Sequence, residues 1–180
     1  MTETGYARHE AAHAVVAVRL ALPLESTDIE NHAMADTSML GLPEGQVVNS
    51  AGLTKLTDGL IDGWIKALPD QEARKMLEAY AVMTAAGVEA ELRRGVSAED
   101  VRCRGDLLNL VGLAHLLGVG SSTEDPAVTT WIRALCVRAW GFLRQDGKAA
   151  WDRVTSALTE RRSLSGDEVK ALVAGPPKSA

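Results

Sequence analysis

Residues 9–18, HEAAHAVVAV, predict a buried helix that carries two histidines on one face. An α-helix turns about 100° per residue, so His9 and His13 lie one turn apart on the same side, where two imidazoles can share one metal ion. The small and apolar residues around them suit a helix inside a core, which is the support that a metal site needs. We expect this helix to run from about Thr4 to Leu22, because Pro23 cannot continue it.

Glu10 completes the pattern HExxH, which is typical of zinc hydrolases. Its carboxylate flanks the two histidines and can take a proton from metal-bound water without being a ligand. The extended pattern HExxHxxGxxH is absent, because the chain has Val16 and Arg19 where glycine and histidine would be needed. The third ligand must therefore come from elsewhere. The alternative for the histidines is an amphipathic first helix on which they are merely solvated or capped.

The residues alone leave the third ligand open between three carboxylates. Asp106 stands at or near the start of an apolar helix, where an aspartate is more often a cap than a ligand. Glu89 and Glu91 compete with it, since a helix carboxylate is a common third zinc ligand. The two other histidines, His32 in a loop-like stretch and His115 in an apolar helix, are expected to be structural rather than catalytic.

Capping signals, proline, glycine and helical periodicity predict a mostly helical bundle with a small β insertion after the first helix. The expected elements are two short strands at Leu24–Asn31 and Gln46–Leu53, a short helix at Leu60–Leu68, a long helix opened by Pro69-Asp70 and closed by Arg93-Arg94-Gly95, an apolar helix at Leu107–Leu117, a helix opened by Asp125-Pro126, a helix around Trp151–Leu158, and a last helix from the capping box Ser165–Glu168 to Val173. With 180 residues and 46% hydrophobic content, the chain is long enough for one core. We therefore predict a single domain over residues 1–174 and a disordered tail over residues 175–180.

Composition and motifs argue against several classes of protein. The net charge of −5 is spread along the chain, so nothing predicts a nucleic-acid groove. No apolar run approaches the roughly 20 residues that span a bilayer, and the first residues lack the layout of a signal peptide, so we expect a cytoplasmic protein without a membrane segment. Cys103 and Cys136 lack the CxxC spacing of a cysteine zinc site and are expected to be free. No P-loop pattern GxxxxGKS/T occurs.

Four segments, in chain order, resemble the proteolytic domain of the FtsH-type AAA proteases, which are zinc metallopeptidases. His9–Ala14 is similar to the family's HEAGHA motif, with Ala12 in place of glycine. A short β region follows, and residues 85–91, AAGVEAE, are similar to a GGRxAEE-like stretch that ends a long helix. Gly105-Asp106-Leu107 stands where the family has Asn-Asp-Leu. Leu158–Glu168 resembles a terminal Leu-x-x-x-x-Thr-Leu-x-x-x-Glu pattern, with Ser163-Leu164 for Thr-Leu.

The resemblance implies a helical, FtsH-type peptidase fold in which His9, His13 and Asp106 hold Zn²⁺ and Glu10 acts as the general base. It implies a zinc-dependent metalloendopeptidase that cleaves peptides or unfolded proteins, which would add as a strand beside the site, here at Gln46–Asn49. Family members usually carry a membrane anchor and an ATPase module. A domain with neither is expected to act without ATP on its own, or with a separate ATPase partner, and the family's hexameric rings suggest a homo-oligomer.

The chain also departs from the family at several positions. The Gly-Gly-Arg of the long helix becomes Ala85-Ala86-Gly87, the first paired glutamate becomes Ala90, and Arg102-Cys103-Arg104-Gly105 replaces a Thr-Gly-Ala-rich loop. These changes concern the substrate cleft and the groups around the proposed ligands. Two alternatives therefore stand beside the peptidase: a peptidase-like fold that is catalytically impaired and serves as a binding or regulatory module, and a different small zincin whose third ligand is not an aspartate.

Overall fold

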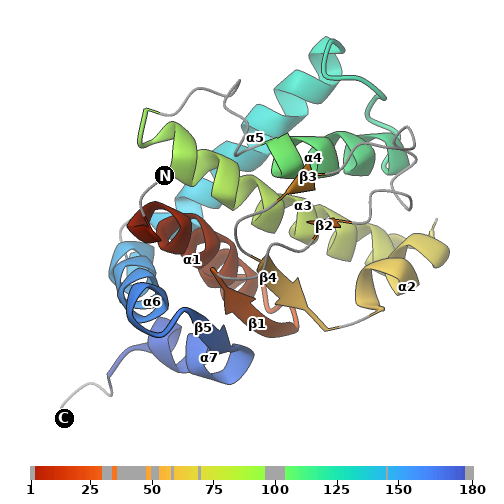
Figure 1. Cartoon of the computed structure of the whole chain (residues 1–180). Helices are drawn as coiled ribbons and strands as arrows, with labels where there is room; N and C mark the ends of the chain where they lie inside the picture. The colour runs from red at the N-terminus through yellow and green to blue at the C-terminus, as the bar shows by residue number, and fades with distance from the viewer. Residues whose placement is uncertain are drawn as a thin grey trace.

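The computed structural model describes residues 3–29, 34–35, 48–49, 53–57, 59–68, 70–95, 104–144 and 146–176. Within these ranges the chain is mainly helical with a small sheet, as the sequence predicts (Figure 1). Its elements in chain order are α1 (Glu3–Arg19), β1 (Leu24–Asp28), β2 (Met34–Ala35), β3 (Val48–Asn49), β4 (Leu53–Leu56), α2 (Leu60–Lys66), α3 (Gln71–Leu92), α4 (Arg104–Leu116), α5 (Pro126–Leu143), α6 (Asp146–Arg161), β5 (Ser163–Ser165) and α7 (Gly166–Ala174).

Helix α1 is central to the packing, because it contacts α3, α5, α6 and α7. The alanines and valines between residues 11 and 17 have no exposed surface. The helix ends at Arg19 rather than at the predicted Leu22. Ala21 has a left-handed φ of 54°, and the N–H of Leu22 donates to the carbonyl of Ala17 at 2.9 Å. The left-handed residue and this hydrogen bond are those of a Schellman motif. The motif ends the helix three residues earlier than the proline alone would require.

Helix α3 lies beside α1 and also packs against α4 and α5 (Figure 1). Asp70 caps its first turn by accepting hydrogen bonds from the N–H groups of Glu72 and Ala73 at 2.9 and 3.0 Å, which confirms the predicted start. Ala85 and Ala86 are fully buried. Because both helices present short side chains, their backbones can approach closely, and groups on one helix can reach the other.

The larger sheet is antiparallel and has the strand order β4-β1-β5. In β1, Thr27 lies opposite Thr54 of β4 on one side and opposite Leu164 of β5 on the other. The strand β5 follows α6 near the end of the chain, so this sheet joins the β insertion to the C-terminal helices. β4 is an edge strand of the sheet that the described residues form.

The predicted strands differ from the observed ones in their bounds. The strand expected at Leu24–Asn31 is present as β1 but ends at Asp28; residues 30–31 lie outside the described residues. The single strand expected at Gln46–Leu53 is wrong. Val48–Asn49 forms β3, which pairs with β2, and Leu53 instead begins β4, which pairs with β1. Residues 46–47 and 50–52 lie outside the described part of the chain.

Helices α5 and α7 begin where the sequence predicts, whereas α6 begins at Asp146, several residues before the helix expected around Trp151–Leu158. Asp125 caps α5, which starts at Pro126, and Ser165 and Glu168 form the predicted capping box of α7. Helix α6 packs on α1, where the indole N–H of Trp151 donates to the carbonyl of Arg8 at 2.8 Å. None of the helices in the described ranges is long and apolar enough to cross a membrane. The single domain over residues 1–174 stays a prediction.

Candidate metal centre

The central part of α1 carries His9, Glu10 and His13; the two imidazoles contact α3 and α4, and Glu10 contacts β4. The Nδ1 atom of His13 lies 2.8 Å from the backbone carbonyl of Met83 on α3. A carbonyl can only accept, so Nδ1 must carry the proton of the neutral ring, and Nε2 is left with a free lone pair. The close packing of α1 on α3 therefore sets both the tautomer of His13 and the direction of its Nε2.

Three potential ligand atoms, two from α1 and one from α4, lie close together. The Nε2 atoms of His9 and His13 are 3.1 Å apart, and Oδ2 of Asp106, in the first turn of α4, lies 3.1 Å from the first and 3.3 Å from the second. Two nitrogens and one oxygen at the corners of a regular tetrahedron around zinc, with bonds of about 2.0–2.1 Å, would be about 3.3–3.4 Å apart. The three atoms thus form one face of a slightly contracted zinc tetrahedron.

The polar atoms of this cluster are poorly satisfied by the protein itself. Oδ2 of Asp106 and Nδ1 of His9 are both buried, and no group is aligned for a hydrogen bond to either atom, although Oδ2 lies within ion-pair distance of both imidazoles. A buried carboxylate oxygen without a donor costs free energy unless a cation or a bound solvent molecule compensates for it. The donor set of two imidazoles and one carboxylate is the set that zinc accepts in hydrolases. The residues present therefore fit a divalent metal ion.

Electrostatic interactions within the cluster favour the charged forms in the absence of a metal. Burial alone would lower the pKa of His9 and of His13, but the neighbouring carboxylates together outweigh it: Asp106 and Glu10 at both rings, and Glu91 also at His9. The pKa of each imidazole is therefore raised, that of His9 well above its usual value. Burial likewise opposes ionisation of Asp106, yet the two imidazoles hold its pKa well below the usual range. Without metal, the cluster is an ion pair that shares protons among three groups.

Glu10 is close to the cluster but is placed differently from the three converging groups. One carboxylate oxygen of Glu10 and one ring nitrogen each of His9 and His13 all lie within 4.8 Å of one another. Oε1 of Glu10 is 4.0 Å from Nε2 of His9, which is farther than the distance from that nitrogen to Oδ2 of Asp106. Its Oε2 accepts a hydrogen bond from the hydroxyl of Thr54 on β4 at 2.9 Å. Burial raises the pKa of Glu10. With His9 and His13, Glu10 forms a buried group that could hold a metal ion, but its carboxylate lies farther from Nε2 of His9 than that of Asp106 does.

The two other candidates for the third ligand, Glu89 and Glu91, are not among the three converging atoms. Oε1 of Glu91 is 3.7 Å from Nδ1 of His9, the ring nitrogen that faces away from the cluster, and 3.3 Å from the guanidinium of Arg94. Glu89 forms an ion pair of 2.7 Å with Arg93. Glu91 thus stands behind His9, where a carboxylate can orient the ring, and Asp106 is the carboxylate that reaches both Nε2 atoms.

The remaining candidate residues are not part of the cluster. His115 is exposed in the last turn of α4, and Cys136 is buried and free, with burial raising the pKa of its thiol to about 12. His32 and Cys103 lie outside the residues that the structure describes.

Gly87 is a site residue that the sequence interpretation missed. A Cβ atom at this position would lie 2.3 Å from Nε2 of His13 and 2.6 Å from Cε1 of His9. Only glycine lets α3 pass this close to both imidazoles. A glycine inside a helix is unfavourable by about 1 kcal/mol relative to alanine, so its presence in a long helix was the available signal.

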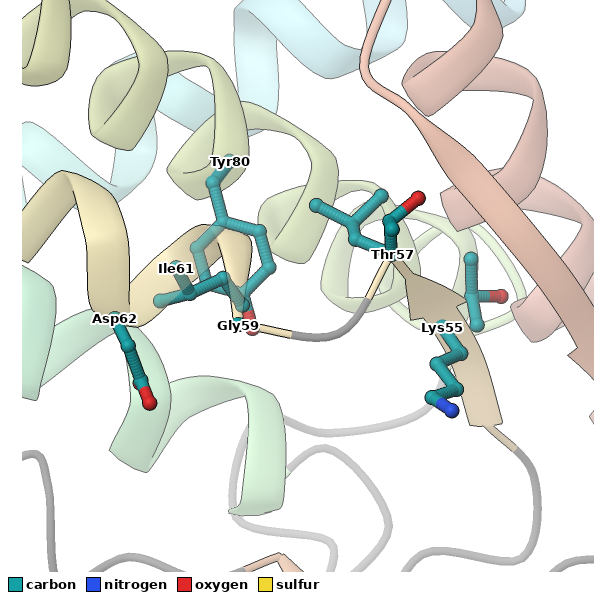
Figure 2. A pocket seen from close by; sticks show the side chains of 8 residues that line it. Lys55, Thr57, Gly59, Ile61, Asp62 and Tyr80 are labelled. Atoms are coloured by element: carbon teal, nitrogen blue, oxygen red, sulfur yellow. The ribbon is translucent and has the colours of Figure 1, made fainter.

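A pocket of about 250 Å³ opens beside the centre, lined by residues of β4, the following turn, α2 and α3 (Figure 2). Thr54, which contacts Glu10, forms part of its wall. So does Tyr80 of α3, whose pKa is raised to about 12, by burial first and then by the negative charge of Asp106. Two of the lining residues therefore interact with the proposed centre, Thr54 through Glu10 and Tyr80 through the charge of Asp106.

No protein-family model matches the chain, and no curated protein matches it either.

Proposed function

We propose that this protein is a zinc-dependent metalloendopeptidase whose metal is held by His9, His13 and Asp106, with Glu10 as the catalytic base. The observation that carries the proposal is the convergence of the two Nε2 atoms and Oδ2 of Asp106 within 3.1–3.3 Å of one another. Glu10 lies alongside. Two segments of the chain that are about 90 residues apart supply these groups in the arrangement that the HExxH chemistry requires.

Zinc is the proposed cofactor because the donor set combines two neutral imidazoles with one carboxylate and leaves a fourth position open. When bound, zinc would supply a Lewis acid that lowers the pKa of water to about 7 and polarises the carbonyl of a peptide bond. No other cofactor is proposed.

Glu10 moves the proton in the proposed reaction. Its carboxylate takes a proton from the attacking water and returns it to the amine that leaves. Thr54 holds Oε2 of Glu10 at 2.9 Å and lies 2.8 Å from the hydroxyl of Thr27. Because Thr54 has one proton and donates it to Glu10, Thr27 must donate to Thr54. This chain of hydroxyls leaves Oε1 of Glu10 directed to the centre.

The substrate is proposed to add as a strand beside the centre. The docking strand expected from the resemblance is Gln46–Asn49, whose described part is β3; it stays an alternative to the strand proposed here. The strand in contact with Glu10 is β4, through Thr54, and β4 is the edge of its sheet in the described chain. A backbone laid along an edge strand is bound with little regard to sequence, which suits peptides and unfolded proteins.

We further propose that the fold is of the FtsH peptidase type. The support is the order of the elements: a first helix with HExxH, a small β region, a long helix that ends near the centre, and a helix with aspartate in its first turn. Action without ATP, a separate ATPase partner, a homo-oligomer and a cytoplasmic location are expectations that follow from this proposal.

The proposed function is tested with the purified chain, a disordered protein substrate and a stably folded one. We expect about one zinc per chain, cleavage of the disordered substrate without ATP, and no cleavage after chelation. Glu10→Gln should keep the zinc but lose a factor of about 10²–10⁴ in rate, because the amide cannot accept a proton. His13→Ala should lose both zinc and cleavage.

The outcomes separate the alternatives. Cleavage that resists the chelator, or equal cleavage of folded and disordered substrates, would contradict the proposal. Stoichiometric zinc without cleavage of either substrate favours a binding or regulatory module. Zinc that survives Asp106→Ala and disappears in Glu91→Ala favours a zincin with a different third ligand.

A further inference from the structure

The pocket next to the proposed centre has the size of a binding site for one side chain. We call it the β4–α2 pocket; it is lined by Thr54, Lys55, Leu56, Thr57, Gly59, Ile61, Asp62 and Tyr80. Its volume of about 250 Å³ is below the roughly 300–1,000 Å³ of pockets that enclose whole small-molecule ligands. Because Thr54 both lines this pocket and donates to Glu10, a segment bound along β4 would place a side chain here when its backbone reaches the centre.

The inner walls of the β4–α2 pocket suit an aliphatic chain. Leu56 is buried, and Ile61 and Tyr80 are partly buried and pack against the core. Tyr80 and Ile61 both line the pocket, and in Figure 2 they are drawn on the side away from Thr57. An aromatic ring at this position can also attract a cation that approaches its face.

The charged groups of the pocket favour a positive ligand. Lys55 and Asp62 lie on opposite sides of the pocket and extend in the same direction (Figure 2). The ammonium of Lys55 is 3.2 Å from the carboxylate of Glu25, so its charge is largely compensated. Asp62 forms neither an ion pair nor a hydrogen bond with the part of the chain that the structure describes. The uncompensated charge at this pocket is therefore negative.

We propose that the β4–α2 pocket binds a lysine or arginine side chain of the substrate, with its aliphatic stem against Leu56, Ile61 and Tyr80 and its charged end at Asp62. The inference rests on the proposed peptidase function and adds a preference for basic residues near the bond that is cleaved. Strand addition provides affinity for any extended chain, and the pocket adds selection at one position.

Binding is measured apart from catalysis, with the zinc-loaded full-length Glu10→Gln variant and blocked peptides that differ only in one central lysine, leucine or glutamate. We expect the lysine peptide to bind about fivefold more tightly than the leucine peptide, as one partly exposed ion pair of about 1 kcal/mol provides. The glutamate peptide should bind most weakly. Adding Asp62→Asn should remove the preference for lysine, and Asp62→Lys should shift it to glutamate.

The matched control is Asp167→Asn, which makes the same change in net charge on α7, at a side chain that is 92% exposed. It should leave the preference for lysine intact. Equal binding of the three peptides, or an equal loss of preference in the control, would overturn the proposal.

Cleavage by the parent protein is then measured with the same peptides. Selective binding that depends on Asp62, without any hydrolysis, would refute the peptidase function and leave the pocket in place. Hydrolysis without selectivity would refute the pocket alone.

Discussion

At the scale of single residues, the centre depends on a glycine as much as on its histidines. Gly87→Ala would place a methyl group 2.3 Å from Nε2 of His13 and 2.6 Å from Cε1 of His9, so the two rings must shift from their positions. We expect zinc affinity to fall at least tenfold, as is typical when the groups around metal ligands are changed, and stability to fall by about 1–3 kcal/mol from overpacking. Competition with a chromogenic chelator measures the first, and urea unfolding measures the second.

The control for this substitution is Gly141→Ala in α5, where a Cβ atom would meet nothing within 4 Å. It should leave zinc binding unchanged and raise stability by up to about 1 kcal/mol, because alanine is the better helix former. A Gly87→Ala variant that is folded and binds zinc like the parent would show that the close approach of α3 at Gly87 is not needed for the metal centre.

The protonation of the same residues predicts how stability depends on pH. Without metal, the raised pKa values of His9 and His13 stabilise the fold at pH below about 6.5, the usual histidine value, and this contribution is lost as pH rises through the raised values. The lowered pKa of Asp106 acts in the opposite sense: its contribution is present above about pH 4 and is lost as pH falls.

The metal-free protein should therefore be most stable between about pH 4 and 6.5 and lose stability toward pH 9, whereas zinc, which needs deprotonated imidazoles, should stabilise it most at the alkaline end. Thermal unfolding across this range, with chelator and with zinc, measures both curves. Metal-free stability that stays constant from pH 6 to pH 9 would argue against the His–Asp ion pairs.

At the scale of elements, the helix caps position the segments that carry the centre. Asp70→Ala removes the acceptor for the N–H groups of Glu72 and Ala73 at the start of α3, and we expect a loss of about 1 kcal/mol. Asp125→Ala on α5 should cost a similar amount, because it removes the bond to the N–H of Ala127. Neither variant should change zinc stoichiometry, since neither cap contacts the centre.

Urea unfolding measures the loss of stability in each variant, and elemental analysis measures the zinc content. Unchanged stability in both variants would show that these caps contribute nothing.

The helices were predictable from the sequence because their signals are local. The caps at Asp70, Asp125 and Ser165 act within three residues of the helix they begin. The strands were less predictable, because β4 is defined by pairing with β1, about 25 residues earlier in the chain. A short run such as Gln46–Leu53 gives no sign of which partner each half will find.

At the scale of the whole molecule, the contacts that complete the site join distant parts of the sequence. His9, Glu10 and His13 follow from one local pattern. The place of Asp106 at a helix start also follows from the local sequence, but its role as third ligand came from the family resemblance. The carbonyl of Met83 and the hydroxyl of Thr54 contact the motif across 70 and 44 residues. Such contacts depend on how α1, α3 and β4 pack, which no single segment encodes.

The central claim, that His9, His13 and Asp106 together hold a metal ion, is tested most directly by a crystal structure of the zinc-loaded protein with anomalous data at the zinc absorption edge. We expect one anomalous peak per chain, about 2.0–2.2 Å from the Nε2 atoms of His9 and His13 and from a carboxylate oxygen of Asp106. Glu10 should lie beside the ion without binding it. A peak at another place, or a carboxylate of Glu89 or Glu91 in the position of Asp106, would contradict the account.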